Sequence, residues 1–220
     1  MTISTRWFWR KSVAGAAMVA LGALPLVSSC TSTQTEGTAS SYLIISSLSA
    51  ASGAKPTDFG AVLASDVLTL VKKTDDSGAT VFVPTIFEDQ GQVTFRLGLK
   101  DPGSASSPSS PTTANFITVT RYHVDFVRAD GRNTPGVDVP FPFDGGLTVT
   151  VGGSSATAGF SIVRLQAKLE APLRALVGFG AADVISTVAK VTFYGTDQAG
   201  RPVSVTGSIS VNFSDWGDPQ

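Results

Sequence analysis

Apolar and polar side chains alternate along 203–213, and this pattern predicts a long β-strand. Val, Ile and Phe residues alternate there with Ser, Thr and Asn. A period of two places the two kinds of side chain on opposite faces of a strand, whereas a helix would spread them around its axis. We expect Ile209 on the buried face and Ser208 on the exposed face. The same alternation predicts strands at 93–99 and 163–170.

Runs rich in β-branched and aromatic residues predict further strands at 42–48, 67–72, 80–87, 116–128, 147–151 and 187–196. Pro84 has no backbone donor, so its run is expected at an edge or a bend. Helix is expected only as short turns, at 58–66, 172–177 and 181–185. The Ser- and Pro-rich segment 101–115 is predicted to be an exposed loop, and 135–146 to be extended or looped.

The succession of about eight or nine strands with turn residues between them predicts an all-β fold, a single antiparallel β-sandwich. Residues 188–213, with two alternating strands around the turn Asp197 to Arg201, resemble the closing hairpin of bacterial immunoglobulin-like and fibronectin-III-like domains. The resemblance implies an immunoglobulin-like sandwich. The chain departs from antibody domains because it lacks a cysteine pair and because Tyr194 lies late in its strand.

The first thirty residues have the pattern of a secretory signal. Arg6, Arg10 and Lys11 precede the uncharged, apolar stretch 13–27. At about 1.5 Å per residue this stretch reaches roughly 22 Å, short of the ~30 Å hydrocarbon core of a bilayer. It therefore predicts a cleaved signal peptide instead of a permanent span.

The signal ends in Val27, Ser28, Ser29 and Cys30, which resembles the lipobox of bacterial lipoproteins. The resemblance implies cleavage before Cys30, a diacylglycerol on its thiol and an acyl chain such as palmitate on the new amino group. Several acyl chains give stable membrane anchoring. Thr31, in place of Asp, implies sorting to the outer membrane. The alternative is an ordinary signal peptide cut nearby, with Cys30 incidental.

These patterns predict a three-part layout. Residues 1–29 are the signal peptide, 30–40 are the lipidated cysteine with a flexible tether rich in Ser and Thr, and 41–220 are the β-sandwich domain. The chain contains 16 basic and 17 acidic residues with no basic cluster, so no nucleic-acid partner is expected. Its single cysteine predicts a domain without an internal disulfide.

His123 is the one histidine of the chain, so any Ser-His-Asp triad would have to use it. Its neighbours place it on a strand, on the face opposite Tyr122, Val124 and Phe126 and near Arg121 and Asp125. A solvent-exposed strand face is the simpler interpretation. We therefore expect no catalytic residue, no cofactor and no metal site.

Two alternatives remain open in the loops. Oxygen ligands for calcium could come from the loop aspartates, although Asp is also a common turn residue. These residues are Asp130, Asp138, Asp144, Asp197, Asp215 and Asp218. The aromatic residues Phe141, Phe143 and Trp216 either pack across the ends of the sandwich or form an exposed contact surface.

The sequence thus predicts an exported, lipid-anchored module of the bacterial cell envelope without catalytic activity. Its partners would be the membrane, through the lipid, and a protein or glycan, through the loops. A carbohydrate-binding or adhesion domain is the second interpretation. A hydrolase that uses two carboxylates is the third.

Overall fold

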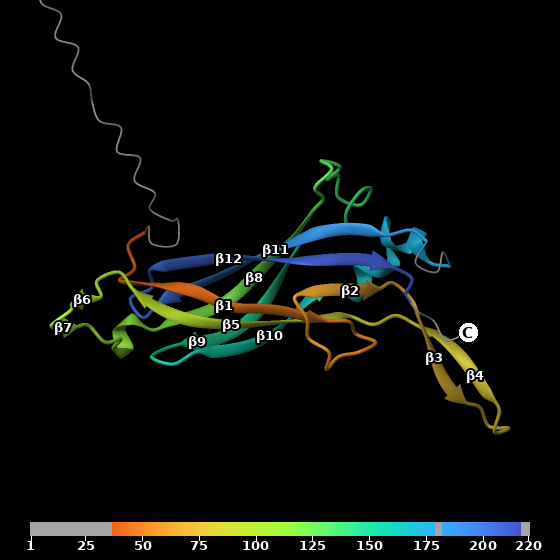
Figure 1. Cartoon of the computed structure of the whole chain (residues 1–220), viewed down its shortest axis with the longest axis horizontal. Helices are drawn as coiled ribbons and strands as arrows, with labels where there is room; N and C mark the ends of the chain where they lie inside the picture. The colour runs from red at the N-terminus through yellow and green to blue at the C-terminus, as the bar shows by residue number, and fades with distance from the viewer. Residues whose placement is uncertain (1–36, 179–181, 217–220) are drawn as a thin grey trace, which may run out of the picture. The chain divides into compact units, whose positions relative to one another are not determined.

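The structure is a computed structural model that describes residues 37–178 and 182–216. These residues form an all-β, sandwich-like fold with two principal sheets (Figure 1). The three-stranded sheet has the order β1 (Ser41–Ala51), β5 (Asp89–Leu99) and β10 (Ala156–Val163), and all its neighbours are antiparallel. Residues 1–36, which include Cys30 and most of the predicted tether, lie outside the described residues, as does Asp218.

The five-stranded sheet has the order β2 (Val62–Asp66), β12 (Pro202–Ser214), β11 (Ile185–Asp197), β8 (Ile117–Val127) and β9 (Phe143–Val151). Its strands are antiparallel except for β2, which pairs parallel to β12. The predicted strands at 42–48, 93–99, 116–128, 147–151, 187–196 and 203–213 all correspond to strands of these two sheets.

The core lies between the two sheets, where their inward side chains meet. Phe95 of β5 and Phe193 of β11 contact edge to face, with ring centroids 5.0 Å apart. Phe160 and Tyr122 extend this aromatic cluster. Burial of these rings, together with their edge-to-face geometry, fixes how the two sheets stack.

Two small hairpins lie outside both sheets. β3 (Thr69–Thr74) and β4 (Thr80–Thr85) pair only with each other, and Figure 1 shows them projecting beyond the sheets. Pro84 lies in β4, a strand with one free edge, as expected. Within the predicted loop 101–115, β6 (Gly103–Ser104) pairs with β7 (Ser107–Pro108), followed by a 3-10 turn, η1 (Thr113–Asn115).

The predicted strand at 163–170 is wrong. β10 ends at Val163, and the α-helical turn α1 (Leu165–Leu169) follows. The pattern placed Lys168 in water and Leu165 in the core, but Lys168 is 1% exposed and Leu165 is 44% exposed. Lys168 is buried here because it forms an ion pair with Asp89, which is described below.

Other segments also differ from the sequence predictions. Residues 62–66 form strand β2, not the helical turns expected at 58–66, because they pair with the end of β12. Val163 is the one residue of β10 that lay in a predicted strand, and β3 begins at Thr69 instead of at 67. A 3-10 turn, η2 (Leu173–Leu176), confirms the expected turn at 172–177, whereas 182–185 contains no helix. No helix in the described parts of the chain is long and apolar enough to cross a membrane.

The strands have a common polarity that defines two ends of the fold. Ser41 at the start of β1 pairs with Leu99, and Ala51 at its end pairs with Gln90. We call the end at Ser41 the entry end, because residues 37–40 lead into β1 there. It holds the loop 100–116 and the turn 198–201. The opposite end is the far end, which holds the connections 52–61, 67–88 and 128–142, residues 164–178 and 182–184, and residues 215–216 after β12.

Candidate functional site

The outer face of the five-stranded sheet carries polar side chains in register across its strands. Arg121, His123 and Asp125 of β8 lie opposite Tyr194, Thr192 and Lys190 of β11. These three in turn lie opposite Ser204, Thr206 and Ser208 of β12. The intervening residues Tyr122, Val124 and Phe126 are buried, so the predicted placement of His123 on the opposite face is confirmed.

The partner of His123 is Asp144 of β9, a residue that the sequence analysis did not bring together with His123. His123 Nδ1 lies 3.2 Å from Asp144 Oδ1, and Asp125 is paired in register with Lys190 instead. The cross-strand neighbour of His123, Thr192, shares its hydroxyl with Thr206 at 2.9 Å. The hydroxyl opposite the imidazole is therefore engaged in a cross-strand hydrogen bond on an open sheet face.

Arg121 is fixed on the same face by an aromatic ring and an acid. Its guanidinium carbon lies 4.0 Å from the centroid of the Tyr194 ring, a cation–π geometry. Its Nη1 atom lies 3.5 Å from Asp144 Oδ1. Asp144 therefore joins Arg121 and His123, and the side chain of Arg121 is 57% exposed.

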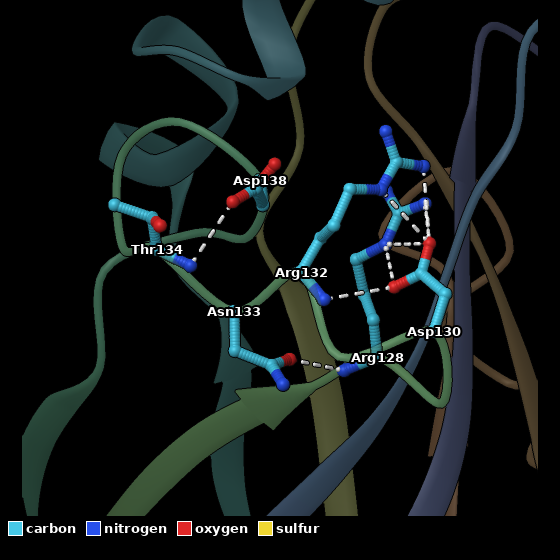
Figure 2. Close-up of polar contacts among 6 residues, drawn as sticks. All are labelled: Arg128, Asp130, Arg132, Asn133, Thr134 and Asp138. Carbon is cyan, nitrogen blue, oxygen red and sulfur yellow. Dashed lines mark hydrogen bonds and ion pairs between the residues drawn. The ribbon is translucent and has the colours of Figure 1, made fainter.

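A second polar cluster organises the connection between β8 and β9 at the far end (Figure 2). Arg128 donates from Nη2 to Asp130 Oδ2 at 2.7 Å, and Arg132 Nη2 lies 3.0 Å from the same oxygen. Hydrogen bonds from the Arg128 guanidinium, and further hydrogen bonds from the backbone and side chain of Arg132, hold the pKa of Asp130 well below its usual range. Asn133 Oδ1 accepts from the backbone N–H of Arg128 at 2.6 Å, which closes the turn.

A buried ion pair lies where β5 begins, also at the far end. Lys168 Nζ donates to Asp89 Oδ1 at 2.8 Å and to the Asp66 carbonyl at 2.7 Å. Asp89 also accepts from Ser65 Oγ at 2.6 Å and from the Gly53 N–H at 2.8 Å. Burial raises the pKa of Asp89, while Lys168 and the other donors oppose that rise. One carboxylate thus connects α1, β2, β5 and the loop that follows β1.

Asp66 extends this network to the last described residues. Its carboxylate accepts from Thr69 Oγ1 at 2.5 Å and from the backbone N–H of Trp216 at 2.9 Å. Trp216 and Asp66 also line a far-end pocket of about 400 Å³, together with residues of β2 and of the loop 52–58. The sequence analysis did not identify Asp66, Asp89 or Lys168 as a site. The alternating pattern placed Lys168 on an exposed strand face, so no buried partner was sought for it.

The loop aspartates considered for calcium have separate hydrogen-bond partners. Asp138 accepts from the Thr134 N–H, Asp197 accepts from two N–H groups of its own turn, and Asp215 accepts from the Gly178 N–H. Within residues 37–178 and 182–216, no group of three or more His, Cys, Asp or Glu side chains could hold a metal ion.

The three aromatic residues near the long loops have different environments. Phe143 is buried, and the Arg164 guanidinium stacks 4.3 Å above its ring. Phe141 is 49% exposed and packs over Gly136, where any Cβ would lie 2.4 Å from the ring. Trp216 is half-buried. Packing therefore accounts for Phe143, whereas Phe141 contributes to the far-end surface.

No protein-family model matches the chain, no curated protein matches it at a significant level, and no solved structure does.

Proposed function

We propose that this chain is a lipid-anchored, non-catalytic module of the bacterial cell envelope that presents its far-end loops to a protein partner. The lipid on Cys30 would hold the chain at the membrane, and the segment 30–40 would let the folded domain extend away from the membrane surface. The outer membrane is the proposed location, on the basis of Thr31.

The polarity of the strands is the observation that carries the proposal. Residues 37–40 enter the fold at one end, and the connections 52–61, 67–88 and 128–142 and residues 164–178 lie at the other. β1 is 11 residues long, which at about 3.3 Å per residue separates the two ends by roughly 35 Å. Binding residues are commonly found on loops that a rigid scaffold positions, so an anchor at the entry end leaves the far end available to a partner.

An immunoglobulin-like topology is part of the proposal. In immunoglobulin domains strands A, B and E share one sheet and strands C, F and G the other. The orders β1-β5-β10 and β12-β11-β8 support this correspondence. The contact between Phe95 and Phe193 joins the two strands that would correspond to B and F, which a disulfide links in antibody domains.

The surroundings of His123 support a non-catalytic role. Its imidazole lies 3.2 Å from Asp144, whose side chain is 64% exposed, on the outer face of the sheet. Screening by water weakens a pair of this kind, whereas catalytic groups generally act in sites that exclude water.

The test uses bacteria that express the full chain with its signal. The wild type should partition into the detergent phase, and Cys30→Ser should move to the soluble fraction. In the same cells, a photo-crosslinking phenylalanine analogue at Phe82 or Phe141, both exposed at the far end, should give a discrete protein adduct.

The matched control carries the analogue at Ser106, which is exposed in the entry-end loop and should give no such adduct. A soluble wild type whose mature N-terminus is not Cys30 would contradict the anchor. Adducts from Ser106 alone, or equally from both ends, would contradict far-end presentation.

A further inference from the structure

A hollow at the entry end has the features of a ligand site and is separate from the far-end loops. Its volume is about 480 Å³, within the range of roughly 300 to 1,000 Å³ typical of small-molecule sites. Its lining includes Arg121, Tyr194 and Gly195 together with the alcohols of Thr120, Thr196 and Ser204.

A β-bulge builds this hollow. Arg121 pairs with Tyr194 and Val119 pairs with Gly195, so Thr120 is an extra residue in β8. The bulge interrupts the alternation, and both Thr120 and Arg121 are exposed on the outer face. Gly195 is required opposite the bulge, because a Cβ there would lie 2.4 Å from the Thr118 carbonyl oxygen.

Arg121 is oriented for recognition of a carboxylate. The Tyr194 ring supports its guanidinium plane at 4.0 Å, and Asp144 contacts it through Nη1. The other N–H groups have no protein partner in the described part of the chain, and the side chain is 57% exposed. A guanidinium held in this way matches the two oxygens of a carboxylate.

The rest of the hollow suits a polyhydroxylated molecule. The hydroxyl groups of Thr120, Thr196 and Ser204 are exposed, and each can donate and accept a hydrogen bond. Two further basic side chains hold the backbone beside the hollow: Lys100 Nζ donates to the Gly37 carbonyl at 2.7 Å, and Arg201 Nη1 donates to the Thr38 carbonyl at 3.2 Å. Arg121, the basic residue of the lining, favours an anionic ligand over a neutral one.

We propose that the hollow binds a saccharide that carries a carboxylate, with Arg121 pairing with the carboxylate and the three alcohols contacting sugar hydroxyls. This site does not depend on the proposed far-end partner, and it would exist with or without the lipid anchor.

The test is isothermal titration of the purified full chain, kept in detergent, with a trimer of galacturonic acid. The matched ligand is the same trimer with its carboxylates methyl-esterified, which removes the charge and keeps the ring hydroxyls. The acidic trimer should bind, and the ester should bind at least about tenfold more weakly, the loss expected when a charge-assisted pair is removed.

Arg121→Gln should weaken binding of the acid by a similar factor, and Tyr194→Leu should weaken it as well. Arg96→Gln is the control, because Arg96 is an exposed arginine on β5 of the other sheet, and it should leave the affinity unchanged. Unfolding midpoints of all variants are compared to identify loss of the fold.

Four results would overturn the proposal: no binding of the acid, equal binding of the ester, equal loss in Arg96→Gln, or displacement of the trimer by inorganic phosphate at equal concentration. The last would indicate a simple anion site. None of these results would bear on the far-end crosslinks, so the two proposals fail separately.

Discussion

At the scale of single residues, Lys168 and Asp89 have the clearest energetic role. Their side chains are 1% and 0% exposed, and each satisfies the other's charge. Removing one member of a buried pair leaves an uncompensated charge in the interior and typically costs about 3 to 5 kcal/mol. Lys168→Met should therefore lower the free energy of unfolding by about that amount in urea denaturation.

Lys190→Met is the matched control, because Lys190 is exposed on the outer face of β11, and its effect should stay within about 0.5 kcal/mol. The double variant Lys168→Met with Asp89→Leu should recover much of the loss, since an apolar pair can replace a buried ion pair. Equal stability of the wild type and Lys168→Met would mean that the pair is not formed.

Asp130 provides a pH-dependent contribution at the same scale. Its folded-state pKa is depressed by the guanidinium of Arg128, relative to about 3.9 in the unfolded chain. The folded state therefore gains stability above about pH 4, and this gain is lost as the pH falls below that value. Asp130→Asn should flatten the decline in unfolding midpoint between about pH 4 and pH 2.5.

The control for this pH series is Asp76→Asn in the exposed turn between β3 and β4, which should keep the slope of the wild type. An unchanged slope in Asp130→Asn would show that the two arginines do not hold this carboxylate in solution.

At the scale of elements, the register of β12 determines which substitutions matter. Ile209 is 3% exposed, whereas Ser208 is exposed on the outer face. Ile209→Ala should cost about 2 to 5 kcal/mol, the usual range for truncation of a buried aliphatic side chain, and Ser208→Ala should stay within about 0.5 kcal/mol. Calorimetric melting of the two variants checks this, and identical melting temperatures would mean that the strand is not buried in this register.

A strand could be predicted from the sequence where its two faces differ in polarity. β12 and β5 were predictable because one face meets the core and the other meets water. Residues 165–169 were not, because an ion pair made by Lys168 with a residue 79 positions away reverses the pattern. β2 was missed because its pairing partner lies at the other end of the chain.

The candidate sites also depend on pairing between strands that a local pattern does not reveal. The strand face of His123 followed from its neighbours, but its partner Asp144 did not, since β9 pairs with β8 through a shifted register. The hollow beside Arg121 depends on the bulge at Thr120, and a single extra residue in a strand leaves little trace in an alternating pattern.

At the scale of the whole molecule, the two ends of the fold differ in how they are held. The far end is fixed by buried and partly buried polar contacts of Asp66 and Asp89 that connect five separate segments. The entry end is held by contacts near the surface, such as those of Lys100 and Arg201 with residues 37 and 38. This arrangement would hold the base of the far-end loops in place before a partner binds. Less conformational entropy would then be lost on binding.

The parallel pairing of β2 with β12 also sets an order of events during synthesis. Val62–Asp66 emerges early but pairs with Ser210–Ser214, almost the last described residues of the chain. The five-stranded sheet therefore cannot close before Ser210–Ser214 has been synthesised, and contacts of such long sequence separation slow folding. A chain whose sheet closes late stays unfolded for longer, and an unfolded chain is what the export that we propose would require.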